Sequence, residues 1–168
     1  VLLWRQIPAS NDRDWLPEVA VAPWAEVTGD LVTIHGVRNL DYRTETAFVP
    51  RWEDRTYDLS KLDSVDLVTV YWAGPAVAHI LVSFGFEGKD YVAVSIETRK
   101  ERGEGYSAIA GFFRQYELVY VVADERDVIR VRTTYRQPQE DVYVYRLRTR
   151  RENIRRAFLA YLRGMNEL

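Results

Sequence analysis

The sequence predicts an α+β fold, built on a mainly antiparallel β-sheet with helices toward the C-terminus. Three observations support this prediction. Apolar and β-branched runs of strand length dominate the chain, short turns separate neighbouring runs, and the clearest amphipathic helix comes last. With 168 residues, 47% of them hydrophobic and 29% charged, the chain has the size and composition of one folded domain.

The first 30 residues are expected to form an irregular segment that packs on a single α+β domain spanning 31–168. Prolines interrupt this segment, and tryptophans are expected to hold it against the domain (Pro8, Pro17, Pro23; Trp4, Trp15, Trp24). The chain starts with "VLLWRQIP", where the apolar run stops after four residues. Removal of a signal or membrane anchor and an arbitrary boundary both fit this start.

Six segments have the pattern of strands, because each is either continuously apolar or alternates between two faces. They are a run from Leu31 to about Gly36, the buried run 65–74, the two arms of the stretch 78–100, the run 116–123, and 140–148. The last of these places Val142 and Val144 on one face and Tyr143 and Tyr145 on the other.

Three segments are candidates for helices. "GYSAIAGFFRQY" (105–116) predicts a short helix, and "DERDVIRVR" (124–132) favours a helix with Asp124 as N-cap over an alternating strand. The clearest helix follows Thr149, which forms a predicted capping box with Glu152. Apolar residues then recur on one helical face (Ile154, Phe158, Tyr161, Leu162, Met165).

The hairpin "AHILVSFGFEGKDYVAVSIETRK" carries one of only two histidines in the chain. Pairing its apolar residues places Ile80 opposite Ile96 and Val82 opposite Val94, with a loop at 87–89. The same register places His79 directly opposite Glu97, close enough for the carboxylate to hold the imidazole. A histidine held in this way can act as a general base, so His79 and Glu97 are the candidate catalytic residues.

Other readings of these residues stay open. A histidine paired with a glutamate also occurs as a structural cross-strand pair on a solvated face, and His35 is expected to be structural. Ser83 shares a face with His79, but a serine in the middle of a strand lacks the sharp turn and the backbone donors of a nucleophile. Because cysteine is absent and no metal-ligand spacing or nucleotide fingerprint appears, we expect neither a metal nor a cofactor.

The charge distribution offers few clues to a partner. The formal net charge is −2, which gives no reason to expect nucleic acid, and the sequence leaves the oligomeric state open. Two arginine-rich clusters, "RKER" (99–102) and "RTRREN" (148–153) with Arg155 and Arg156, suit anionic headgroups. The acidic residues among them also fit an ordinary, salt-bridged surface.

Long stretches of the chain resemble the bacterial Lnb N-terminal periplasmic domain family. The resemblance runs from about Asn11 to the C-terminus and is carried by these motifs: "VTIHGVRNLDYRTET", "RTYDLSKLDSVDLVTVYWAGPAVAHILVSFGF", "YVAVSIETRKERGEGYSAIAGFFRQYELVYVVADERDVIRVRT" and "EDVYVYRLR". The family is similar to permuted papain-like enzymes of the NlpC and lecithin:retinol acyltransferase type. In these enzymes a strand histidine comes first, a polar residue on the next strand orients it, and a nucleophilic cysteine follows at the start of a helix.

The resemblance implies a periplasmic domain tethered to the inner membrane, with a permuted papain-like fold that lacks its nucleophile helix. His79 matches the base and Glu97 the orienting residue, while the cysteine is expected in an Asn-Cys-Thr motif after Leu168, outside this sequence. The implied activity is thiol-dependent acyl transfer or hydrolysis, for which this chain alone is expected to be inactive. The family name implies lipoprotein N-acylation, with phospholipid and lipoprotein as partners at the membrane surface. A non-catalytic domain that binds lipid or cell-wall material, and a structural scaffold for a membrane partner, are the alternatives.

Overall fold

The computed structural model describes residues 10–72, 74–103 and 117–168. Within these ranges the chain forms an eight-stranded sheet in the order β1-β2-β9-β8-β7-β6-β10, with β5 paired to β2, and a separate β3–β4 ribbon. The strands are β1 (Trp24–Thr28), β2 (Leu31–Arg38), β3 (Asp41–Tyr42), β4 (Phe48–Val49), β5 (Trp52–Asp58), β6 (Leu62–Tyr71), β7 (Ala78–Phe86), β8 (Asp90–Arg99), β9 (Glu117–Ala123) and β10 (Asp141–Arg146).

The predicted α+β class with mainly antiparallel pairing is confirmed. Among the described strands, only β2 and β9 pair in parallel, through the single pair Arg38 and Ala123. The helices are α2 (Glu125–Arg130), which continues into a π-helical turn at Val131–Tyr135, and α3 (Arg151–Glu167). A short 3-10 turn (Pro17–Val19) lies near the N-terminus. Neither α2 nor α3 is long and apolar enough to cross a bilayer, and no other helix of the described ranges is either.

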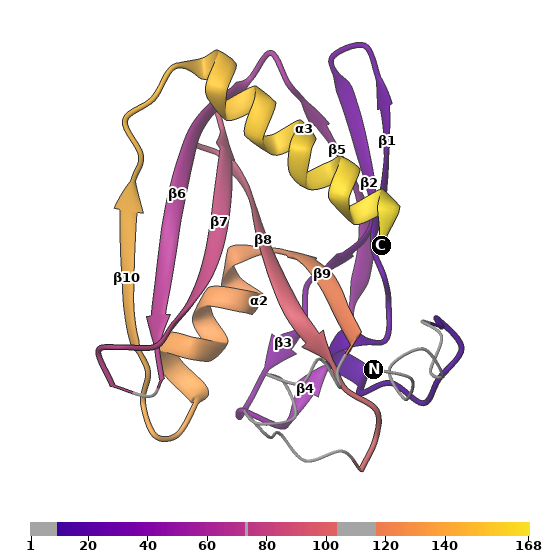
Figure 1. Cartoon of the computed structure of the whole chain (residues 1–168), viewed down its shortest axis with the longest axis vertical. Helices are drawn as coiled ribbons and strands as arrows, with labels where there is room; N and C mark the ends of the chain where they lie inside the picture. Colours follow the sequence, from indigo (N-terminus) through magenta and orange to yellow (C-terminus); the bar gives the residue numbers. More distant parts are fainter. Residues whose placement is uncertain (1–9, 73, 104–116) are drawn as a thin grey trace, which may run out of the picture.

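The two helices cover opposite faces of the sheet, because each packs on a different core. In Figure 1, α3 crosses the upper part of the sheet and α2 lies lower in the view. The alternation of side chains along each strand creates both cores. On β7, Phe84 packs edge-on against Phe158 of α3, with ring centroids 4.9 Å apart. The odd-numbered Leu81 of the same strand faces the other side and is buried in the core under α2 with Val128. Burying Phe158 completely contributes about 2–3 kcal/mol of free energy.

Most predicted elements are present. The six predicted strands correspond to β2 and β6–β10, and Asp124 caps α2 by accepting a 3.0 Å hydrogen bond from the backbone of Arg126. The predicted apolar face of α3 is buried, apart from the half-buried Tyr161. The helix predicted at 105–116 lies outside the described residues.

Two local predictions were wrong. The segment 1–30 is not irregular throughout, because Trp24–Thr28 form β1 by pairing with Leu31–His35 across a turn at Gly29, whose φ of +64° suits glycine. The Thr149–Glu152 capping box does not form, because α3 begins one residue later, with Arg150 as N-cap. The hydroxyl of Thr149 instead accepts a hydrogen bond from the side-chain amide of Asn153.

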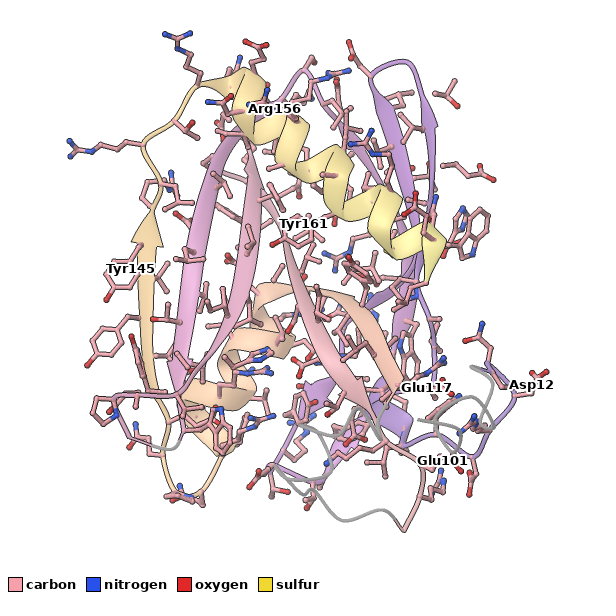
Figure 2. All side chains as sticks on the ribbon, in the orientation of Figure 1. Asp12, Glu101, Glu117, Tyr145, Arg156 and Tyr161 are labelled. Atoms are coloured by element: carbon pink, nitrogen blue, oxygen red, sulfur yellow. The ribbon has the colours of Figure 1, made fainter. Side chains whose placement is uncertain are left out.

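The N-terminal segment is held on the domain by arginines rather than by tryptophans alone. Arg99 is buried, donates to the carbonyls of Val19 and Ala20, and lies 4.5 Å over the buried ring of Trp15, as predicted for a tryptophan that pins this segment. Arg13 forms ion pairs with Glu101 and Glu117, which lie together at one end of the sheet in Figure 2. The "RKER" cluster therefore holds the N-terminal segment, since Arg99 is buried beneath it and Arg102 forms an exposed pair with Asp14.

Candidate functional site

The histidine hairpin has the predicted register. The β7–β8 ladder runs from Leu81–Ser95 to Phe86–Asp90 and includes the predicted pair of Val82 and Val94. The loop at 87–89 is also confirmed. Its glycine is second because Glu87 and Gly88 both take positive φ angles, 52° and 64°, and the Lys89 amide bonds back to the Phe86 carbonyl.

Beyond the last ladder pair, His79 and Glu97 point to the same face of the sheet and contact each other. Nε2 of His79 lies 3.1 Å from Oε1 of Glu97 and 2.7 Å from Oγ of Ser95. The Ser95 hydroxyl donates its proton to Oε1 of Glu97 at 2.7 Å, so it can only accept from the imidazole. Nε2 therefore carries the ring proton and Nδ1 the lone pair. Among the described residues, Nδ1 of His79 has no hydrogen-bond partner.

Arg132 completes this cluster from the π-helical turn that follows α2. Its Nη2 donates to Oε1 of Glu97 at 2.7 Å, and its Nη1 donates to the carbonyl of Val128. Burial raises the pKa of Glu97, but the hydrogen bond from His79 and the charge of Arg132 outweigh it and hold this pKa well below its usual range. Glu97 is therefore a carboxylate at neutral pH, suited to hold His79 in one orientation.

The cluster lies in the wall of a cleft of about 680 Å³. His79 and Glu97 both line it, with about a quarter of each side chain exposed, whereas Ser95 is buried and does not reach the cleft. Apolar side chains from several elements form about half of the lining (Leu16, Val19, Phe48, Val70, Trp72, Val77, Ile96, Leu118, Val131). Charged side chains form much of the rest (Glu18, Arg38, Glu45, Lys100, Arg132, Arg136, Glu140). A concave site that combines apolar surface with converging polar groups can hold a small molecule.

A buried ion pair lies behind another part of the cleft lining, which includes Arg38. Arg38 donates two hydrogen bonds, of 3.1 and 2.9 Å, to the carboxylate of Asp127, which is fully buried and also accepts from the amide of Leu40. This pair joins β2 to α2, and the Arg38 Nη1 donates to the Glu18 carbonyl in the N-terminal segment. Nearby, burial raises the pKa of Tyr42 to about 12, so its hydroxyl stays protonated in the cleft.

The other sequence candidates lie elsewhere. Ser83 donates a 2.6 Å hydrogen bond to Glu125 and is almost fully buried, so it does not contact His79. His35 is held by Asp54 at 2.8 Å and stacks on Trp24 with ring centroids 4.0 Å apart, a structural arrangement on β2. Within the described ranges, no three His, Cys, Asp or Glu side chains converge as metal ligands.

Two residues of the cluster were not predicted. Ser95 is two residues before Glu97 on the same strand face, so the alternation of β8 already placed it beside the histidine. No pattern in the sequence indicates Arg132, which lies 35 residues after Glu97 in the chain. The two residues meet only because α2 packs against the sheet.

Comparison with known proteins identifies the family. The model of the Lnb N-terminal periplasmic domain family matches residues 48–168, which include His79, Ser95, Glu97 and Arg132. No curated protein and no solved structure matches the chain significantly. The match covers well over half of the chain and bears out the predicted family and its periplasmic location. The chain belongs to the family of Lnb N-terminal periplasmic domains.

Proposed function

We propose that this domain supplies the general base of a thiol-dependent acyltransferase or hydrolase, with His79 as the base and Glu97 and Ser95 as its positioning residues. One observation carries the proposal: Nε2 of His79 is engaged by Ser95 and Glu97, while no residue in the described part of the chain bonds to Nδ1, on a side chain that lines the cleft. The carboxylate fixes the tautomer and stabilises the imidazolium that forms when Nδ1 takes a proton.

The proposed reaction has two steps. Nδ1 accepts the proton of a cysteine thiol, and the thiolate adds to an acyl carbonyl. Collapse of the adduct breaks the bond to the leaving group, which takes the proton back from His79 and departs, leaving an acyl-thioester. An amine or water then attacks the thioester, loses its proton to Nδ1, and releases the thiol. For lipoprotein N-acylation, which the family resemblance implies, the acyl donor is a phospholipid and the acceptor a lipoprotein amine.

The nucleophile has to come from outside this sequence, which contains no cysteine. We place it in the polypeptide that follows Leu168, in a periplasmic protein tethered to the inner membrane. The last helix packs on the face of the sheet opposite to His79, where Asn166 bonds to both backbone groups of Ala25 in β1. The following polypeptide therefore has to pass around the sheet to reach the cleft. The 168-residue chain alone is expected to be inactive.

The test is thioester trapping in the full-length protein. After incubation with phospholipid, an acyl group that hydroxylamine releases is expected on a cysteine downstream of Leu168. His79→Ala should slow acylation at least 100-fold, the usual contribution of a general base. His35→Ala, which removes the other histidine, is the matched control and should acylate at the normal rate. Acylation of His79→Ala at the normal rate would remove the base from the proposal.

A second candidate is a binding module without chemistry, favoured by the apolar side chains that form part of the lining of the same cleft. Its ligand would be lipid or cell-wall material with an apolar portion. In that case the full-length protein retains ligand without forming a thioester, and His79→Ala retains it equally well. Ligand retention by equilibrium dialysis, measured beside the trapping assay, separates the two functions.

A further inference from the structure

The arginine-rich segment that joins β10 to α3 is only partly neutralised. Two arginines that flank it are neutralised, since Arg146 of β10 pairs with Asp66 and Arg155 of α3 pairs with Asp30. The exposed side chains of Arg148, Arg150 and Arg151 have no carboxylate partner among the residues that the structure describes. An ordinary salt-bridged surface, one of the two interpretations of this cluster from sequence, therefore does not account for these three arginines.

Exposed aromatic and apolar side chains lie directly beside the three arginines. Tyr143 and Tyr145 of β10 are each about half exposed and stack with centroids 6.4 Å apart, and Leu147 is 41% exposed. In Figure 2, Tyr145 projects outward from the edge of the sheet, and Arg156 marks the nearby start of α3. We name the surface formed by Tyr143, Tyr145, Leu147, Arg148, Arg150 and Arg151 the 143–151 edge.

We propose that the 143–151 edge docks the domain on an anionic lipid bilayer. Guanidinium groups bind phosphate oxygens in pairs, and each arginine near an anionic surface strengthens binding about fivefold. Tyrosine side chains suit the headgroup level, because the ring is apolar and the hydroxyl is polar, and Leu147 can enter the acyl boundary. The family match makes this a periplasmic domain, and the periplasm is bounded by membranes, so lipid phosphate is an anion within reach of the 143–151 edge.

This inference does not depend on His79, because the 143–151 edge includes none of the cleft residues. A second copy of the chain is the competing occupant, since β10 is the last strand of the described sheet and leaves one side of its backbone unpaired. The unneutralised charge favours lipid, because two copies of the same edge would bring like charges together.

The first test is co-sedimentation of the 168-residue chain with vesicles. We expect the chain to bind vesicles of phosphatidylcholine with 30% phosphatidylglycerol in 20 mM salt. We expect this binding to be lost in 500 mM salt, or when the vesicles lack the anionic lipid. The triple variant Arg148→Gln, Arg150→Gln, Arg151→Gln should lower partitioning about 100-fold. The matched control, Arg43→Gln, Arg51→Gln, Arg102→Gln, removes the same charge from exposed sites elsewhere and should bind normally. Equal losses in the two triple variants would overturn the proposal.

The second test uses the absence of cysteine, which makes any introduced thiol a unique labelling site. An environment-sensitive fluorophore on Leu147→Cys should shift to the blue with anionic vesicles, whereas one on Thr28→Cys, exposed on β1, should not. A shift at both positions, or at neither, contradicts docking through this edge. A shift at Leu147→Cys that grows with protein concentration in the absence of lipid would assign the edge to a second copy instead.

Discussion

The free energy of unfolding of the Glu97→Gln variant is a sharp test of the cluster around His79. The Glu97 carboxylate accepts hydrogen bonds from Arg132 and Ser95, both at 2.7 Å, and contacts Nε2 of His79 at 3.1 Å. Glutamine keeps one acceptor oxygen but removes the charge, so the Arg132 guanidinium, only 4% exposed, is left inside the protein without its counterion. Breaking a buried ion pair costs 3–5 kcal/mol, and since a quarter of Glu97 is exposed we expect about 3 kcal/mol at pH 7.

The pH dependence follows from the lowered pKa of Glu97. Burial raises this pKa, but the hydrogen bond from His79 and the charge of Arg132 lower it by a larger amount. The Glu97 carboxylate therefore binds a proton less readily in the folded state than in the unfolded state. The stabilisation is complete above the ordinary value of 4.5 and is lost as the pH falls below 4.5 toward the folded-state pKa. The difference between the wild type and Glu97→Gln should therefore shrink below pH 4.5.

The assay is urea unfolding at pH 7.0, 5.5, 4.5 and 3.5. Glu87→Gln is the matched control, because its carboxylate is half exposed, 3.8 Å from Lys61, and should contribute less than about 1 kcal/mol. The double variant Glu97→Gln, Arg132→Met should lose less stability than the sum of the single variants, since it leaves no unpaired charge. If Glu97→Gln lowers the free energy of unfolding by no more than Glu87→Gln does, the ion pair between Glu97 and Arg132 is not buried as described.

Two further predictions concern packing away from the cluster. A Cβ on Gly164 of α3 would lie 2.5 Å from the Tyr120 hydroxyl and 3.3 Å from the Cζ of the same ring, so Gly164→Ala should lower the melting temperature in the wild type. The loss should be smaller in a Tyr120→Phe background, because phenylalanine lacks the atom that lies closest to the new methyl group. An equal loss in the two backgrounds would exclude the contact. Arg99→Met should release the segment that contains Trp15 from the domain. The release should be detected as faster proteolysis within residues 10–20, with the global stability of the sheet unchanged. Arg102→Met, which removes only an exposed ion pair, is the control and should leave the cleavage rate unchanged.

The sequence predicted those elements whose stability comes from their own apolar pattern. β6 was predictable from a nearly continuous apolar run, and α3 from the helical period of its buried residues. The β7–β8 register was predictable because only one pairing matches apolar to apolar. β5 was not predicted, since Tyr57 is its only buried residue and its backbone pairing with β2 holds it in place. β3 and β4, two residues each, carry no periodic signal.

The residues of the candidate site also fall into a predictable group and an unpredictable group. His79 and Glu97 were predictable because two neighbouring strands of known register determine which residues meet. The role of Arg132 was not, because it depends on how α2 and the turn after it pack across the sheet, which no local pattern encodes. The pairing of Arg38 with Asp127, 89 residues apart in the chain, belongs to the same class of tertiary contact.

The tautomer of His79 is the most direct test of the central claim. The chain has only two histidines, so long-range ¹H–¹⁵N correlation spectra of the wild type and of His35→Gln assign the His79 ring nitrogens without ambiguity. At a pH where the ring is neutral, we predict a proton on Nε2 and a lone pair on Nδ1, and Ser95→Ala or Glu97→Gln should shift the populations toward a mixture. A proton on Nδ1 in the wild type, with the lone pair turned toward Ser95 and Glu97, would leave no free base in the cleft and contradict the proposed role of His79.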